Sequence, residues 1–346
     1  MTATSLATRL RASPELFPLD LEIGEAAALI ELNPVDYERA SFLDARMQRP
    51  TVARLPYPEL AAAAEGLPVA CDYIFHVGHV GSTLMSRVLG THPAVFSLRE
   101  PQVLRTLAQA EALGAWTPQL LDARLNVFLA LLSRTWTPAR RATIKATSLV
   151  SELAGRLLDQ QPGARALMMT AAPAVYLATI LGGPNSRQEL ALAAPGRLAR
   201  LNRRLGGPRW RLEALSEGEL AAMSWACEMS ALGAAAGRNG ERCAWIDFDR
   251  FLADPRAGLS RALTALHGRA DPAQVEAMAR SPYFERYSKA PEYGYSPALR
   301  REVLAAAERD HGGEIRRGLA WLEAAARTET PLAEILSTAE ALSHVA

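Results

Sequence analysis

The sequence predicts an α/β fold in which a mostly parallel sheet lies between two layers of helices. From residue 70 onward, short apolar runs alternate with longer helical patterns. Ten or more residues of helical pattern separate successive runs, so the strands cannot form hairpins and must be joined by crossovers. With 346 residues, 49% of them hydrophobic, the chain is long and apolar enough to bury such a core.

The elements follow from the chain in order. Apolar runs predict strands at 73–77, 94–97, 142–145, 164–170 and 242–246. Helical patterns fill the intervals at 82–89, 101–136, 148–158, 173–181 and 215–237. A stretch rich in Gly, Pro and Arg, 182–210, precedes the last of these helices.

Three segments organise the chain. Residues 1–70 are predicted to be a helical N-terminal extension, because prolines punctuate this region and its alanine run at 61–65 is ended by Gly66. Residues 71–297 form the α/β domain. Residues 298–346 are predicted to be a helical segment that packs on the same domain.

Charge and composition exclude several classes of function. The 38 basic and 37 acidic residues give a net charge of +1, so bulk electrostatics recruits neither nucleic acid nor an anionic membrane. No long apolar stretch is free of charge and the N-terminus lacks a secretory signal, so we expect no membrane partner and a cytoplasmic location. Three scattered cysteines and six histidines without ligand spacing predict no disulfide framework and no metal.

The most informative segment joins the first strand to its helix. Gly78 and Gly81 are followed by Ser82 and Thr83, which open the helix. Glycines permit a tight bend that brings successive N–H groups close to one oxyanion, and a helix N-terminus adds donors and partial positive charge. The pattern therefore predicts an anion-binding turn, although alone it is equally typical of an ordinary strand-to-helix turn.

The Walker form G-x-x-x-x-G-K-[ST] is not met. With Gly81 as its second glycine, Ser82 stands where the lysine belongs and His76 where the first glycine belongs. That lysine supplies charge to the β- and γ-phosphates of a nucleotide, so its absence argues against a nucleotide kinase or ATPase.

The segment resembles the 5′-phosphosulfate-binding loop of sulfotransferases that use 3′-phosphoadenosine 5′-phosphosulfate (PAPS), which has the form P-[RK]-S-G-[ST]-T-L. The last four positions match, whereas Gly78, His79 and Val80 replace the proline, the basic residue and the first serine. The resemblance implies a P-loop-like three-layer sandwich and PAPS as the sulfuryl donor, with His79 in the place of the basic residue. The alternative for His79 is a neutral turn residue. The implied PAPS-binding residues of the loop are Gly78, Val80, Gly81, Ser82, Thr83 and Leu84.

The resemblance extends to two strand ends. Glu100 follows the second strand 19 residues after Gly81, where some family members place the base that deprotonates the acceptor. A carboxylate with a pKa raised by burial has this chemistry, but an exposed glutamate that opens a helix is the alternative. Lys145 ends the third strand, where family members carry a lysine that touches the transferring sulfuryl group. Thr147 replaces the histidine base of other members, which favours Glu100 as the base.

The 3′-phosphate site departs from the family pattern. Ala171 stands in place of the family's arginine, and Thr179 takes the place of its serine. Arg187 or Lys289 are the candidates to supply the missing charge, although Arg187 fits a surface position equally well.

Two further segments have structural interpretations. Asp247 follows the last strand, where it resembles a magnesium ligand, but without the Walker lysine we predict a capping role. Trp225 and Glu228 share one face of a helix, for which core packing is the default.

The sequence therefore predicts a PAPS-dependent sulfotransferase that acts on a hydroxyl or amine, with Glu100, Lys145 and His79 as catalytic residues. An ATP-dependent P-loop phosphotransferase and a catalytically degenerate nucleotide-binding relative remain as alternatives. The sequence does not identify the acceptor, whose pocket we expect between 101–136, 182–215 and 281–297.

Overall fold

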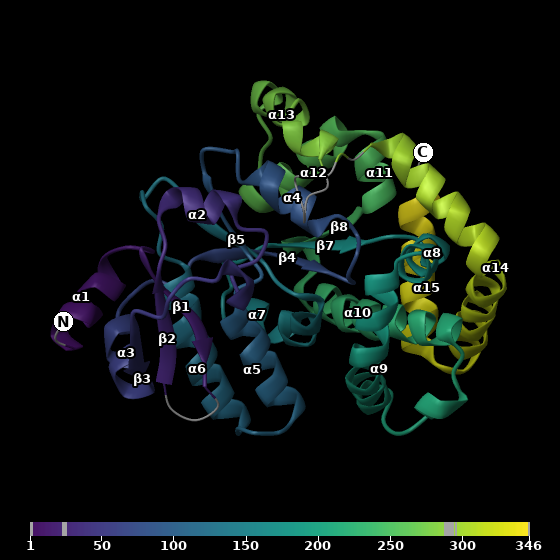
Figure 1. Cartoon of the computed structure of the whole chain (residues 1–346), viewed down its shortest axis with the longest axis horizontal. Coiled ribbons are helices and arrows are strands. Elements are labelled where there is room, and N and C mark those ends of the chain that lie inside the picture. The colour runs from purple at the N-terminus through teal and green to yellow at the C-terminus, as the bar shows by residue number, and fades with distance from the viewer. Residues whose placement is uncertain (1–2, 23–25, 287–293, 295, 345–346) are drawn as a thin grey trace.

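Five strands form the centre of the computed structural model, which describes residues 3–22, 26–286, 294 and 296–344 (Figure 1). They are β4 (Cys71–His76), β5 (Val95–Arg99), β6 (Arg141–Lys145), β7 (Ala166–Thr170) and β8 (Cys243–Asp247). Their order in the sheet is β5-β6-β4-β7-β8, and every neighbouring pair is parallel. The predicted α/β class and the five predicted strands are confirmed.

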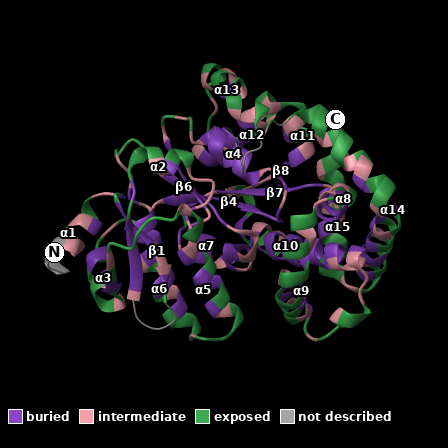
Figure 2. Ribbon diagram, viewed as in Figure 1, coloured by how far each residue is buried: buried purple, intermediate pink, exposed green. Residues whose placement is uncertain are grey.

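The central strand explains why apolar runs predicted this sheet. All six residues of β4 are buried, because strands flank it on both sides and helices cover both faces (Figure 2). Asp72 is its one acidic residue and is 1% exposed. It accepts a hydrogen bond of 2.7 Å from Nε of Arg141 in β6 and one of 2.9 Å from the amide of Arg165, so its buried charge is paired.

Helices form a layer on each face of the sheet (Figure 1). One layer contains α4 (Ser82–Leu89), α12 (Pro255–His267) and α13 (Pro272–Ala279), which lie above the sheet in this view. The other contains α5 (Gln102–Ala112), the 3₁₀ helix η2 (Ser148–Leu153), α7 (Ala154–Asp159) and α10 (Glu217–Asn239). Because the connection after β4 runs to one face and the connection after β6 to the other, the carboxyl ends of these strands mark the expected ligand position.

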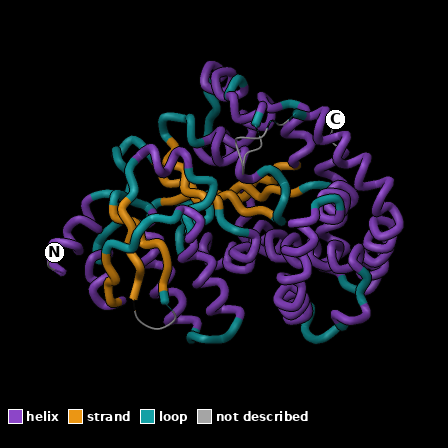
Figure 3. Tube along the Cα trace, in the orientation of Figure 1, coloured by secondary structure: helices purple, strands orange, loops and turns teal. Residues whose placement is uncertain are grey.

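The prediction of a purely helical N-terminal extension is wrong. Strands β1 (Leu16–Leu21), β2 (Ala26–Glu31) and β3 (Ala53–Pro56) form an antiparallel sheet, separate from the central one (Figure 3). The sequence of β2 is AAALIE, which has a helical composition, but pairing with β1 and β3 overrides that propensity. The helices of this region are α1 (Ala3–Ala12), α2 (Pro34–Arg39), η1 (Ala45–Met47) and α3 (Tyr57–Ala64), of which α3 contains the predicted alanine run.

The remaining helices pack around the sheet and its two helical layers. The Gly-, Pro- and Arg-rich stretch contains α9 (Pro184–Arg204), which packs on α10 and accommodates Pro195 in its interior. Helices α14 (Pro297–Thr328) and α15 (Thr330–His344) form the predicted helical C-terminal segment and pack on α10. The other helices are α6 (Pro118–Leu132), α8 (Pro173–Leu181), α11 (Phe248–Ala253), η3 (Leu212–Ala214), η4 (Gly240–Arg242) and η5 (Pro282–Glu285). Across the described part of the chain, no helix combines the length and apolarity needed to cross a bilayer.

Two glycines of α10 provide a matched test of helix packing. A Cβ at Gly218 would lie 1.9 Å from the carbonyl oxygen of Glu314 in α14, whereas a Cβ at Gly237 meets nothing within 4 Å. We expect Gly218→Ala to lower the free energy of unfolding by about 1–3 kcal/mol, because a backbone atom cannot move aside. Gly237→Ala should raise it by about 0.5–1 kcal/mol. Urea unfolding measures both, and equal stability of the two variants would contradict the close approach of α10 and α14.

Candidate active site

The segment between β4 and α4 is a tight bend. Gly78 and Gly81 have φ angles of 97° and 66°, values that glycine adopts without strain. The ring of Phe248, the first residue of α11, packs against Gly81 so closely that a Cβ there would lie 1.9 Å from a ring carbon. The bend is therefore fixed both by its backbone conformation and by an aromatic ring behind it.

The bend and the start of α4 present unused hydrogen-bond donors. The amide of Gly78 donates to Nδ1 of His76 at 3.0 Å. By contrast, the amides of residues 80–84 donate to no acceptor among the described residues. Oγ1 of Thr83, in a residue that is 1% exposed, has no partner in the same set. Buried polar groups are normally paired, so this cluster of donors fits a bound oxyanion at the helix N-terminus.

Gly81 provides a test of this conformation. Gly81→Ala combines a left-handed backbone with the clash against Phe248, so we expect the free energy of unfolding to fall by about 2–4 kcal/mol. Gly114 is the matched control, because its φ is 64° and a Cβ there meets nothing within 4 Å. Gly114→Ala should cost only the strain, about 1 kcal/mol. Urea unfolding of both variants measures the difference, and equal losses would exclude a specific contact of Phe248.

The structure brings Glu100 and Lys145 into direct contact. The amide of Glu100 donates to the carbonyl of Lys145 at 2.6 Å, which extends the pairing of β5 with β6. The Lys145 ammonium donates to a Glu100 carboxylate oxygen, and their side chains are 0% and 12% exposed. Lys145 also lies opposite Ile74 of β4, so this ion pair stands at the strand ends beside the bend.

Backbone strain is concentrated at the predicted site. In the described ranges three residues other than glycine have a positive φ: Gln48, His79 and Glu100. A left-handed conformation at such residues costs free energy and persists only where the surroundings enforce it. Two of the three are residues that the sequence nominated for catalysis, which supports a functional reason for their conformation.

The N-terminal extension contributes to this site, which the sequence did not indicate. Nη2 of Arg46 lies 4.0 Å from Oε2 of Glu100, and the Phe42 ring centre lies 5.8 Å from Nζ of Lys145. Burial is the largest single effect on the pKa of Arg46 and lowers it, but the hydrogen bond to Asp44 and the nearby carboxylates together raise the pKa overall. Glu100 and Glu189 add to the increase, which places Arg46 within the field of both carboxylates.

His79 lies against α9. Its Nε2 is 3.3 Å from a carboxylate oxygen of Glu189, and its Nδ1 is 3.4 Å from Oγ of Ser186. The imidazole forms an ion pair with Glu189 when it is protonated, so His79 has a partner for its charged form.

The residues predicted for the 3′-phosphate do not form a cluster with the bend in the described contacts. Thr179 donates its hydroxyl to the carbonyl of Val175 at 2.7 Å, within α8, so its proton is already used. The Arg187 side chain is 40% exposed and lies 3.9 Å from Glu217. Lys289 lies outside the described residues.

Asp247 has the predicted capping role. Its carboxylate accepts a hydrogen bond of 3.0 Å from the amide of Arg250 and begins α11. Burial raises the pKa of Asp247. Throughout the described residues, no group of three or more His, Cys, Asp and Glu side chains is placed to hold a metal ion.

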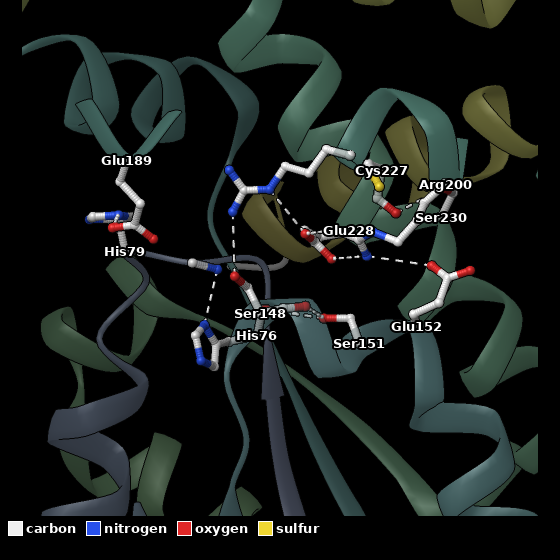
Figure 4. A network of polar contacts seen from close by, with 12 residues as sticks. His76, His79, Ser148, Ser151, Glu152, Glu189, Arg200, Cys227, Glu228 and Ser230 are labelled. Atoms are coloured by element: carbon white, nitrogen blue, oxygen red, sulfur yellow. Dashed lines mark hydrogen bonds and ion pairs between the residues drawn. The ribbon is translucent and has the colours of Figure 1, made fainter. Parts of the chain in front are cut away.

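A buried network behind the bend was not predicted (Figure 4). Arg197 and Arg200 of α9 bind Glu228 of α10 at 3.1 and 2.8 Å. Arg197 also donates to Oγ of Ser148 at 3.4 Å. Burial alone would raise the pKa of Glu228, but the two guanidiniums lower it overall. The available signal was Glu228 itself, because an acidic residue on a buried helix face requires a partner.

No protein-family model matches the chain, and no curated protein is significantly similar to it. Among solved structures, it is similar to a sulfotransferase domain from the curacin biosynthetic pathway, with 13% identity, a TM-score of 0.41, and coverage of 74% of this chain and 98% of that one. Sulfotransferase STF9 from Mycobacterium avium has 16% identity and a TM-score of 0.37, with 73% and 79% coverage. A sulfotransferase domain from the Synechococcus PCC 7002 olefin synthase has 14% identity and a TM-score of 0.40, with 78% and 94% coverage.

Proposed function

We propose that this chain is a sulfotransferase that moves a sulfuryl group from PAPS to a hydroxyl or amine. The observation that carries the proposal is the set of unused donors at residues 80–84, beside the Glu100–Lys145 ion pair. An oxyanion site next to a buried cation and a carboxylate contains the groups that sulfuryl transfer requires.

The donors at the bend suit the 5′-phosphosulfate end of PAPS. The amides of residues 80–84 and the hydroxyl of Thr83 would hold it, because they donate hydrogen bonds and carry no negative charge that would repel an anion. When bound, PAPS supplies the sulfuryl group and a phosphate leaving group. For the 3′-phosphate we keep Arg187 or Lys289 as the candidates for positive charge, and Thr179 can donate to it only if its hydroxyl turns away from Val175.

Three residues around the donor site have separate roles in the transfer. Lys145 supplies positive charge where negative charge grows on the bridging oxygen. Glu100 accepts the proton of the acceptor hydroxyl or amine, since it is the carboxylate nearest to that lysine. His79 lies at the bend with Glu189 as the partner of its charged form, so it adds positive charge there when it is protonated.

A thermal-shift comparison tests the proposal. Adenosine 3′,5′-bisphosphate at a hundredfold excess over its Kd should raise the melting temperature by about 4 °C without Mg²⁺. Adenosine 5′-monophosphate should give a smaller shift, because it lacks the 3′-phosphate. Stabilisation by ATP with Mg²⁺ alone would favour a phosphotransferase, and no shift with any nucleotide would overturn the proposal.

A further inference from the structure

Helix α9 contacts the anion-binding bend near its start and the neighbouring 3₁₀ helix η2 further along. Near its start, Ser186 and Glu189 contact His79. Two turns further on, Arg197 donates a hydrogen bond to Ser148, the first residue of η2. The bend is therefore flanked by a helix that carries an exposed carboxylate at one end and buried guanidiniums at the other.

The buried part of this network has more positive than negative charge. Among the residues that the structure describes, Arg197, Arg200 and Arg204 form ion pairs with two carboxylates, Glu228 and Glu152. The side chains of Arg197 and Glu228 are 8% and 0% exposed, so solvent screens this surplus poorly. One guanidinium charge thus lacks a full counter-charge, and Arg197 is the member of the network that reaches toward the bend.

Ser148 lies between that guanidinium and the bend. A Cβ built on Gly78 would lie 3.9 Å from Oγ of Ser148. Oγ accepts the hydrogen bond from Arg197 and donates its own proton to no acceptor in the described ranges. Ser151 of the same 3₁₀ helix is different, because its hydroxyl donates to the carbonyls of Ser148 at 2.5 Å and His76 at 3.4 Å.

We propose that Ser148, held by the buried guanidinium of Arg197, is a further ligand of the oxyanion that binds at the bend. A hydroxyl that accepts from a cation becomes a stronger donor, because hydrogen bonds in a chain polarise one another. This donor brings part of the network's positive charge to a bend that lacks a lysine or arginine of its own. Ser148 is the ligand, and Arg197 is the positioning residue that acts through it.

The inference uses the proposed function only to identify the ligand, so the experiment has an arm that is independent of it. Isothermal titration calorimetry measures the Kd of adenosine 3′,5′-bisphosphate, adenosine 3′-monophosphate and inorganic pyrophosphate. Ser148→Ala should raise the Kd of the bisphosphate and of pyrophosphate by about tenfold, the usual effect of losing a hydrogen bond to a charged group. The 3′-monophosphate, which has no 5′-oxyanion, should bind as it does to the native chain.

Arg197→Gln should produce a similar loss, and the double variant should lose no more than the larger single loss, because both changes remove one interaction. If the loss of affinity in the double variant equals the product of the two single losses, Arg197 does not act through Ser148 and its role as a positioning residue is overturned. Ser151→Ala is the matched control and should leave all three Kd values unchanged. Ser148→Ala carries the test alone if Arg197→Gln fails to fold.

The remaining outcomes separate the two proposals. If the Ser148→Ala variant binds the bisphosphate with the Kd of the native chain, the inference is overturned and the proposed function is left intact. An equal loss for the 3′-monophosphate would overturn it as well, since the effect would not be confined to the bend. Ser148-dependent binding of pyrophosphate without binding of either nucleotide would support the inference and overturn the proposed function. Binding of none of the three ligands would overturn both.

Discussion

Lys145→Met should lower the rate of sulfuryl transfer by about 10²–10³-fold, with saturating acceptor and donor. Lys145 is the buried cation at the strand ends beside the bend, and its charge is held there by Glu100. Methionine keeps much of the side-chain volume and removes the charge, so the loss reports electrostatic stabilisation of the transition state. A coupled assay that measures release of adenosine 3′,5′-bisphosphate provides the rate.

The variant also leaves the Glu100 carboxylate, which is 12% exposed, without its ammonium partner. Some instability is therefore expected, and it must be separated from the effect on transfer. The double variant Lys145→Met with Glu100→Gln removes both charges and should regain part of the lost stability, yet remain as inactive as the single variant. Transfer at the native rate by Lys145→Met would exclude the lysine from the chemistry.

Glu100→Gln provides a separate test of the base. It keeps the size and shape of the side chain but replaces one carboxylate oxygen by an amide NH2 group, so it cannot accept a proton. The rate at saturating acceptor should fall by about 10²–10⁴-fold, the usual contribution of general base catalysis. An unchanged rate would show that another group takes the proton, while the Lys145 prediction would stand.

The central sheet could be predicted from the sequence because its strands are buried on both faces. Such strands are short apolar runs, and glycine or proline punctuates their helices. For this reason the predicted bounds of two helices, 82–89 and 173–181, are those of α4 and α8. The N-terminal sheet could not be recognised in the same way. Strand β2 pairs with β3, which begins more than twenty residues later, and nothing local in AAALIE indicates that partner.

In the candidate site, too, the residues next to strands could be predicted and those from distant segments could not. The bend, Glu100 and Lys145 follow strands directly, so motif and strand position were sufficient to nominate them. Arg46 and Arg197 approach from segments far away in sequence, and Arg197 is 49 residues from Ser148. Each depends on a tertiary contact that no spacing rule encodes. Glu228 shows what was missed, since a buried acidic residue beside Trp225 implied cations on a neighbouring helix.

Removal of the Glu228 charge from the buried network should destabilise the fold more than removal of a carboxylate from a surface ion pair. Glu228→Gln leaves two guanidiniums, Arg197 and Arg200, without the carboxylate between them, so the free energy of unfolding should fall by about 3–5 kcal/mol at pH 7. Glu276→Gln is the matched control, because its partners Arg256 and Arg280 are exposed. Surface pairs contribute little, so this variant should unfold at nearly the native urea concentration.

The pH dependence distinguishes loss of the charge from a packing defect. Burial opposes ionisation of Glu228, but the guanidiniums outweigh it and lower the pKa of Glu228 in the folded state. An unfolded glutamate titrates near pH 4.3, so the stabilisation is fully present above roughly that value and is lost as pH falls through the lower folded pKa. The native chain should therefore lose stability in acid while Glu228→Gln loses less, and the gap between them should narrow below about pH 4. Urea unfolding at pH 3.5, 5 and 7 measures that gap, and a gap that is constant across this range would show that Glu228 acts through its shape and not its charge.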